Sequence, residues 1–466
     1  MSAPLDIARG ALAEFDAWLV GGAVRDRLLG RPTADLDLVI DGDVRAAART
    51  LARAVRGPAF ELSDEFGAWR VHAGDRTWQA DLNPLRGGSL DADLGLRDFT
   101  VNAIAEPLEG GDPVDPFGGA QDLAAGRLRA VGDRAFADHP LRVLRLARHA
   151  TELGLTPEDA TIALARDQAA RLRDVAQERV FAELKRIVVA DEAVAGLRLA
   201  ERIGALHAVL PELSDLHGVE QTVYHHRDAH GHTLEVLERA VAIDRDPVAI
   251  LGAEHGEQVA AVLRRPLADE LDRGAGLRFG ALLHDIAKSR TAVPSPKGGF
   301  GFPGHDTQGA EMAREILTRL RTSEHLKRHV ADLTRHHLKA GFLVHHMPLD
   351  QRTIYAYLRA TDRVAVDVTL LSLADRLATR GRKHGEAIAK HEEVIEVLLG
   401  PALAWDEHGA PAPLIRGDEL AAELDLPKGP RVGELLAELA AAQYAGEIAT
   451  REDALSYARA AVPSPR

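Results

Sequence analysis

The chain has 466 residues and no cysteine, 46% of its residues are hydrophobic, and its formal net charge is −14 at pH 7. This length predicts about two to four domains, and the lack of cysteine excludes disulfides, thiolate metal sites and a thiol nucleophile. The negative charge argues against nonspecific binding of nucleic acid over the whole surface, although a local basic groove is compatible with it.

The first part of the chain alternates segments typical of strands and of helices. Strands are expected at residues 16–22 and 34–42, and an amphipathic helix at 43–55 follows the second strand. Two further strand-like segments, 68–74 and 77–85, predict a hairpin. Together these elements predict an α/β head, with a small mixed sheet and flanking helices.

After about residue 135 the strand signals largely end, and Leu, Ala, Ile and Val recur at helical spacing. The spacing is clearest in four segments, 140–154, 178–189, 277–288 and 309–321. A loop rich in Gly and Pro is expected at 292–306, and residues 401–420 are expected to be turn-rich before a short helical tail. The predicted fold class is therefore an α/β head followed by an all-α body.

Two aspartates one residue apart lie in the second expected strand. Side chains of Asp35 and Asp37 point to the same face there, because side chains alternate along a strand. Neighbouring carboxylates repel unless a cation compensates, and Mg²⁺ bound by carboxylates and substrate phosphates is a common reason for such a pair. Asp81, from a neighbouring strand, is a candidate third carboxylate. Taken alone, such a pair is more often a solvated acidic edge.

The segment before these aspartates supplies the context. The first strand ends in Gly21 and Gly22, and a helix that carries Arg25 follows. Glycine allows close approach of the backbone, a helix N-terminus favours anions, and the Arg fork suits phosphate. In this order and spacing the residues predict a polyphosphate cradle that faces a two-carboxylate metal site.

These motifs carry a family resemblance. GGAVRD followed by DLD resembles the first motif of class II nucleotidyltransferases, the bacterial tRNA CCA-adding enzymes and poly(A) polymerases. The resemblance continues in order through a second motif, a third motif, the base-reading helix and the next neck helix, at residues 96–105, 115–129, 138–155 and 177–188. It implies a catalytic head at 1–133, a helical RNA-binding neck at 134–215 and, further on, a tail at 396–466.

The resemblance implies a reaction and its metal ligands. Asp35 and Asp37 would hold two Mg²⁺ ions, assisted by Asp81. The tRNA 3′-hydroxyl would attack the α-phosphate of CTP or ATP, and pyrophosphate would leave.

It also implies which residues bind the nucleotide. Gly21, Gly22 and Arg25 would hold the triphosphate. Arg97 and Asp98 would bind nucleotide, with Asp98 suited to accept a hydrogen bond from the ribose 2′-hydroxyl, and Asn102 would lie beside them.

The base-reading segment departs from the family. The usual Glu-Asp-x-x-Arg start is Asp138-His139-Pro140-Leu141-Arg142 here, so that His139 stands where the family has Asp. A neutral imidazole accepts one hydrogen bond, so reading of an amino group on C or A stays possible. The alternative is an ordinary i,i+4 ion pair between Asp138 and Arg142.

Two further features concern which nucleotides the enzyme would add to the tRNA end. Arg142, Arg145 and Arg148 form a stripe along one helix, which either contacts the triphosphate or the tRNA end or is a solvated face. The loop between Leu82 and Arg97 is short, which in this family is associated with addition of only the two cytidines. Addition of CCA, of CC or of A alone therefore stays open.

The helical body holds a second constellation, within residues 216–395. Adjacent His284 and Asp285 resemble the signature of HD-domain phosphohydrolases, with His232 as the first ligand and Asp375 as the last. The remaining implied residues are His305 and either His336 or His337 for a second metal, and Lys288 for a phosphate oxygen. The implied chemistry is attack of metal-activated water on a phosphoester, with the metal unidentified. By analogy, the substrates would be 2′,3′-cyclic phosphates, 2′-phosphates or nucleotides.

The leading interpretation is a template-independent tRNA nucleotidyltransferase that builds or repairs the 3′-terminal CCA and carries an HD domain. Its partners would be tRNA, CTP and ATP. The alternatives are a CC-only or A-only enzyme, a poly(A) polymerase, and an HD hydrolase with a silent RNA-binding head. Because the sequence shows neither a run that could span a bilayer nor a signal-peptide pattern, we expect a cytoplasmic protein without membrane contact.

Overall fold

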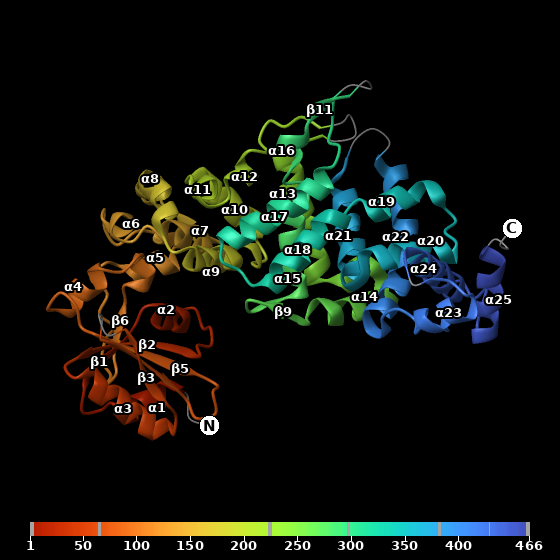
Figure 1. The fold of residues 1–466 in the computed structure, drawn as a ribbon. Coiled ribbons are helices and arrows are strands. Elements are labelled where there is room, and N and C mark those ends of the chain that lie inside the picture. The colour runs from red at the N-terminus through yellow and green to blue at the C-terminus, as the bar shows by residue number, and fades with distance from the viewer. Residues whose placement is uncertain are drawn as a thin grey trace. The chain divides into compact units, whose positions relative to one another are not determined.

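The structure, a computed structural model, describes residues 4–63, 67–221, 226–295, 299–380, 384–427 and 429–462. The chain divides into two compact units, Met1–Val209 and Leu210–Arg466, which Figure 1 shows in red to yellow-green and in green to blue. Within the described residues, every helix is too short or too polar to cross a membrane.

The first unit is built on a six-stranded mixed sheet, with strand order β3-β4-β5-β2-β1-β6. Strands β2 and β5 are parallel, with Asp37 opposite Asp81, and the other neighbours are antiparallel. The strands are β1 (Asp16–Val20), β2 (Asp35–Asp41), β3 (Ala59–Ser63), β4 (Ala68–His72), β5 (Gln79–Pro84) and β6 (Ala105–Pro107).

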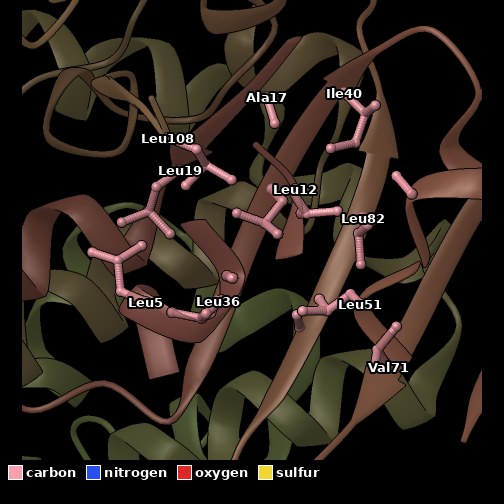
Figure 2. Close-up of a cluster of buried hydrophobic side chains, with 14 of the residues drawn as sticks. Leu5, Leu12, Ala17, Leu19, Leu36, Ile40, Leu51, Val71, Leu82 and Leu108 are labelled. Carbon is pink, nitrogen blue, oxygen red and sulfur yellow. The ribbon is translucent and has the colours of Figure 1, made fainter. Parts of the chain in front are cut away.

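The two faces of this sheet have different roles. In β2 the side chains of Leu36, Leu38 and Ile40 are buried in one cluster with residues of helices α1 (Pro4–Ala11) and α3 (Val44–Val55). Figure 2 shows this cluster, in which Leu5 and Leu51 of the two helices meet the strands. The alternating side chains of β2, Asp35 and Asp37 among them, therefore lie on the opposite face. Burial of Leu36, Leu38 and Ile40 on one face thus places the Asp35 and Asp37 carboxylates together on the other.

Helices follow the sheet within the first unit. Helix α7 packs against α8, α9 and α10, and β7 (Arg127–Leu128) pairs with β8 (Thr156–Pro157). The remaining elements are α2 (Gly22–Leu28), α4 (Leu90–Gly95), η1 (Thr100–Asn102), α5 (Gly119–Ala124), α6 (Ala135–Asp138), α7 (Arg142–Leu153), α8 (Asp159–Gln168), η2 (Ala169–Asp174), α9 (Gln177–Val188), α10 (Ala193–Arg202) and α11 (Ala205–Val209).

Among its described residues, the second unit is helical apart from two short ribbons, β9 with β10 (Pro266–Ala268, Leu271–Asp272) and β11 with β12 (Val293–Pro294, Phe300–Gly301). Helix α15 is buried over its whole length, as expected for a helix that is surrounded by others, and it packs against α13, α18 and α21. The helices are α12 (Pro211–Ser214), α13 (Ala229–Arg245), α14 (Pro247–Leu263), α15 (Arg273–Leu283), α16 (Lys288–Thr291), α17 (His305–Arg319), α18 (Glu324–His336), α19 (Lys339–Leu343), η3 (Val344–His346), α20 (Gln351–Thr361), η4 (Asp362–Val364), α21 (Ala365–Ala378), α22 (His384–His408), α23 (Gly417–Glu423), α24 (Pro430–Tyr444) and α25 (Arg451–Ala461).

The predicted fold class, an α/β head followed by a helical body, is confirmed. One boundary is wrong: residues 401–408, expected to be turn-rich, continue helix α22 through Pro401. The apolar side chains of Leu399, Leu403 and Trp405 are buried there, which outweighs the backbone hydrogen bond that proline cannot donate. The short segment between Leu82 and Arg97 also contains a helix, α4, whose N-cap is Ser89.

Candidate nucleotide site and histidine cluster

A cavity of about 570 Å³ opens beside Asp35 and Asp37 in the first unit. This volume is within the range of small-molecule sites. Its walls come from the β1–α2 turn, strand β2, the segment from α4 to η1, and helices α7 and α9. The expected site residues that line it are Gly21, Gly22, Arg25, Asp35, Asp37, Arg97, Asp98, Asn102, Arg142 and Arg145.

The carboxylate side of the cavity suits a cation. Burial raises the pKa of Asp37 to about 6; Arg97 opposes this increase, and the carboxylates of Asp81 and Asp35 add to it. A carboxylate that is costly to ionise because of burial and like charges is stabilised by a bound cation. Asp35 and Asp37 therefore fit a divalent metal.

Asp81 is in a different situation. It lies opposite Asp37 in the parallel register, but its two oxygens accept hydrogen bonds from Arg70 Nε and Nη2 at 2.6 and 2.7 Å. Among the described residues it does not line the cavity. Arg70 thus already supplies Asp81 with a counter-charge.

The glycine turn brings the backbone close to the site. Gly21 has φ of +69°, a conformation that favours glycine. A Cβ atom there would lie 2.8 Å from Arg97 Nη1 and 3.4 Å from Asp37 Oδ2. Neighbouring Arg25 is buried and donates through Nη1 to Asn102 Oδ1 at 2.6 Å. The turn, the two arginines and the carboxylate thus form one packed group.

Asp98 also lines the cavity and is held by several donors. Its Oδ1 accepts from the Phe99 backbone N–H at 2.9 Å and from Asn102 Nδ2 at 2.8 Å. Burial by itself would raise its pKa, but neighbouring His149, Arg145 and the Asn102 hydrogen bond together hold the pKa below its ordinary range. Asp98 is therefore a fixed carboxylate acceptor at neutral pH.

The arginines of α7 are divided in their roles. Arg145 Nε donates to Glu183 Oε1 at 2.8 Å, and Arg148 Nε lies 2.7 Å from Glu183 Oε2. Arg142 instead donates to the backbone carbonyls of Ala135 at 3.0 Å and Leu96 at 2.5 Å. The predicted stripe is therefore not a freely solvated face: one buried glutamate of α9 pairs with two of its arginines.

The structure does not bring Asp138 and His139 into the cavity. Both are exposed, and they lie at the junction where α6 ends, at Asp138, before α7 begins at Arg142. The structure pairs Asp138 with Arg134 Nη2, at 2.7 Å, and Arg142 with backbone carbonyls, in place of the alternative ion pair between Asp138 and Arg142. Of the expected base-reading run, Arg142 is the residue that lines the cavity.

Several cavity residues were missed by sequence reasoning. Asp93 lies on α4, the segment expected to be nearly empty, and its Oδ2 accepts from Arg97 Nη2 at 3.3 Å. The Ser89 cap with two aspartates in the next turn could have indicated that helix. His149 lies four residues after Arg145 on α7, so helical spacing could have indicated it.

In the second unit, histidines and aspartates converge in two groups. His232, His284 and Asp375 form one group, and Asp285, His305 and His337 form the other. In each group one ligand atom from every residue lies within 4.8 Å of the others. Of the two candidates His336 and His337, the structure brings His337 to the cluster.

The orientation of three imidazoles suits metal binding. Nδ1 of each ring contacts a backbone carbonyl, His284 to Ala281 at 2.8 Å, His305 to Phe302 at 2.6 Å and His337 to Thr334 at 2.6 Å. A carbonyl only accepts, so Nδ1 donates and each neutral ring keeps its lone pair on Nε2. These Nε2 atoms lie 3.0, 3.3 and 3.7 Å from the Asp285 oxygens. Backbone contacts of this kind orient metal-binding histidines.

Lys288 is already engaged. Its Nζ lies 2.6 Å from Asp285 Oδ2 and donates to Gln221 Oε1 at 2.6 Å. The expected contact with a phosphate oxygen would therefore share this ammonium group with Asp285.

Comparison with families of known proteins gives three matches. Residues 17–129 match the poly A polymerase head domain. Residues 154–216 match the probable RNA and SrmB-binding site of polymerase A, and residues 230–380 match the HD domain.

Individual proteins match over nearly the whole chain. An A-adding tRNA nucleotidyltransferase of Deinococcus radiodurans is 38% identical, over 95% of this chain and 94% of its own length. A CC-adding tRNA nucleotidyltransferase of Thermus thermophilus is 35% identical, over 95% of this chain and 93% of its own. A solved CCA-adding enzyme with ATP has a TM-score of 0.66 at 18% identity, over 98% of this chain and 95% of its own, and is thus similar in fold.

Proposed function

Because this chain belongs to the family of tRNA nucleotidyltransferases with a poly(A) polymerase head domain, we propose that it extends the 3′ end of tRNA with CTP and ATP, without a nucleic-acid template. The chain is an enzyme of the nucleotidyltransferase type. The observation that carries the proposal is the shared cavity: Asp35 and Asp37 line the same space as the phosphate-binding arginines and Asp98.

The side chains of the cavity have separate tasks in the proposed reaction. Arg25 and Arg97 bind phosphate oxygens, and the Gly21 backbone leaves room for them beside Asp37. Asp98 accepts a hydrogen bond from the ribose 2′-hydroxyl. The 3′-hydroxyl oxygen of tRNA loses its proton to solvent and forms a bond to the α-phosphorus; the bond from that phosphorus to the α–β bridging oxygen breaks, and pyrophosphate leaves.

Two Mg²⁺ ions held by Asp35 and Asp37 would supply charge neutralisation for the triphosphate and a more acidic attacking hydroxyl. The raised pKa of Asp37 supports a cation at this position. Asp81, paired with Arg70, assists by holding negative charge next to Asp37.

The test uses three tRNA transcripts that end in the discriminator base, in C and in CC. Each is incubated with the enzyme, Mg²⁺ and CTP, ATP or both, and the 3′ ends are sequenced. Addition of CCA to the shortest transcript identifies a complete enzyme. Addition that stops at CC, or A added only to the CC end, identifies one of the two specialists.

Two outcomes would contradict the proposal. Long A tails on any RNA would favour a poly(A) polymerase. Failure to extend any transcript would reject nucleotide transfer and favour an HD hydrolase with a silent head. Asp37→Asn is the matched control: it keeps the side-chain volume, and we expect it to abolish addition.

We further propose that the histidine cluster is a metal-dependent phosphohydrolase site. The converging Nε2 atoms and the Asp285 carboxylate support it. A divalent metal held there would supply an activated water for attack on a phosphoester. Candidate substrates are 2′,3′-cyclic phosphates, 2′-phosphates and nucleotides.

Metal content and hydrolysis test this second proposal together. We expect the purified protein to retain a divalent metal that elemental analysis detects, and to hydrolyse 2′,3′-cyclic AMP or 2′-AMP. Asp285→Asn should lose both properties, whereas His336→Asn should retain both. Full metal content in the Asp285→Asn protein would reject the site.

The domain boundaries that the resemblance implies, at residues 133, 215 and 395, are part of the same proposal. The family matches that begin at residues 17, 154 and 230 support this order of parts.

A further inference from the structure

His149 contacts a group of hydrogen-bonded polar side chains that line the cavity, Arg25, Asn102 and Asp98. It lies on α7, is 5% exposed and lines the cavity with Asp98 and Asn102. Its Nε2 atom lies 3.1 Å from Arg148 Nη2 and 3.5 Å from Asn102 Nδ2. A guanidinium group only donates hydrogen bonds, so Nε2 is the acceptor and the neutral ring carries its proton on Nδ1; the single Nε2 lone pair is shared between the nearer Arg148 donor and the more distant Asn102 amide.

Asn102 connects His149 to the groups on either side. Its Oδ1 accepts from Arg25 Nη1 at 2.6 Å, and its Nδ2 donates to Asp98 Oδ1 at 2.8 Å. If the amide were turned over, its NH₂ group would face the Arg25 guanidinium, and its oxygen would face the Asp98 carboxylate. In the first orientation Asn102 Nδ2 faces both Asp98 Oδ1 and His149 Nε2. The acceptor at His149 thus adds to the preference that Arg25 and Asp98 set for this orientation.

Two features keep His149 available as an acceptor. Its ring packs nearly perpendicular to the Phe99 ring, with centroids 5.6 Å apart and planes at 86°, which restricts its rotation. Burial, assisted by the charge of Arg148, also lowers the pKa of His149 well below its ordinary value. The ring is therefore neutral at pH 7, and Nε2 keeps its lone pair.

We propose that His149 is a positioning residue for recognition of the nucleotide sugar: it holds the Asn102 amide toward Asp98 and so keeps the Asp98 carboxylate in place for a ribose 2′-hydroxyl. This inference rests on the proposed nucleotide transfer. It assigns to a side chain of α7 a role in distinguishing ribonucleotides from deoxyribonucleotides. His149 need not touch the nucleotide for this role.

The test compares the full-length wild-type enzyme with two variants. His149→Phe keeps the ring against Phe99 but removes the acceptor, and His149→Gln can place its Oε1 near the former position of Nε2. The measured quantity is the ratio of kcat/KM for a ribonucleotide triphosphate to that for its 2′-deoxy analogue. The nucleotide used is whichever one the wild-type enzyme adds to tRNA.

We expect His149→Phe to lower this ratio about tenfold, as for loss of one buried hydrogen bond, mainly through a higher KM for the ribonucleotide. We expect His149→Gln to recover most of the ratio. A purely structural role would lower kcat for both triphosphates equally and leave the ratio unchanged. Thermal unfolding of each variant identifies any loss of folding.

Three results would overturn the inference. His149→Phe could keep the wild-type ratio, or both variants could lose the ratio equally, which would rule out the acceptor at Nε2. A wild-type enzyme that adds nucleotide but accepts deoxy analogues equally well would reject the role of Asp98. By contrast, a wild-type enzyme that adds no nucleotide at all would reject the proposed function itself.

Discussion

A Cβ atom at Gly21 would lie 2.8 Å from Arg97 Nη1 and 3.4 Å from Asp37 Oδ2. The side chain at this position therefore determines how closely the backbone, the arginine proposed to bind phosphate and the carboxylate proposed to bind metal can approach one another. Gly30 has nearly the same positive φ, +67°, but no atom lies within 4 Å of a Cβ built there. The two glycines separate the effect of backbone strain from the effect of close packing.

We predict that Gly21→Ala lowers kcat/KM for nucleotide addition by roughly 100-fold, because displacing reacting groups by about 1 Å has an effect of that order. Gly30→Ala, the matched control, carries the same backbone strain and should keep wild-type activity. Both variants should lose about 1 kcal/mol of stability. Equal activity in the two variants would contradict the close-packing argument.

The lowered pKa of His149 leads to a prediction about how the stability of the folded protein depends on pH. Its pKa in the folded protein is below the ordinary value of 6.5, so below pH 6.5 the unfolded chain binds more protons than the folded chain. The folded state therefore loses stability as the pH falls from about 6.5, by up to about 1.4 kcal/mol per pH unit. Asp98, whose pKa is lowered from an already acidic ordinary value, contributes only at lower pH.

Urea unfolding of the wild-type protein and of His149→Phe at pH 7, 6 and 5 measures this contribution. Three of the four tryptophans, Trp18, Trp69 and Trp78, lie in the first unit and report on its unfolding by fluorescence. We expect the wild-type protein to lose more stability than the variant between pH 7 and 5. Parallel loss in both proteins would mean that His149 titrates normally.

Helices α7 and α9 are joined by one buried carboxylate. Glu183 of α9 lies 2.8 Å from Arg145 and 2.7 Å from Arg148, and Arg148 also lies 3.5 Å from Glu152. Both arginines line the cavity, so the position of α9 influences part of the candidate nucleotide site. Removal of one partner from a buried ion pair is strongly destabilising, because the remaining charge is uncompensated.

We predict that Glu183→Ala lowers the free energy of unfolding of the first unit by about 3 kcal/mol and reduces nucleotide addition. Glu178→Ala is the matched control on the same helix, because Glu178 is exposed. It should change stability by less than about 0.5 kcal/mol. Urea unfolding followed by tryptophan fluorescence measures both, and similar losses for the two variants would contradict the role of Glu183.

At the scale of the whole molecule, the two candidate sites lie in separate compact units. The carboxylates of the nucleotide cavity belong to residues before Val209, and the histidine cluster belongs to residues after Leu210. Each site is held by contacts within its own unit. Chemistry at one site should therefore be separable from chemistry at the other.

We predict that Asp37→Asn abolishes nucleotide addition but leaves the metal content of the histidine cluster unchanged. Asp285→Asn should lose that metal and keep wild-type nucleotide addition. Elemental analysis after removal of loosely bound metal, together with the tRNA extension assay, measures both properties on each protein. Loss of both properties in either variant would show that the sites depend on each other.

The fold class was predictable because the relevant patterns are local. A period of two in β2 separates Leu36 and Leu38 from Asp35 and Asp37, and burial of the apolar positions then fixes the face of the carboxylates. The end of α22 was not predictable in the same way. Proline normally ends a helix, but the burial of Leu403 and Trp405 continues it.

By itself, the sequence determined which chemical groups are present and which neighbours along the chain share a face: Gly21 before Arg25, Asp35 with Asp37, and His284 with Asp285. The tertiary structure alone decided which distant groups meet. In the folded chain Asp81 pairs with Arg70, His337 and not His336 joins the histidine cluster, and His139 lies outside the cavity. Local geometry follows from the periods of helix and strand, whereas contacts such as Asn102 with His149, 47 residues apart, depend on how whole elements pack.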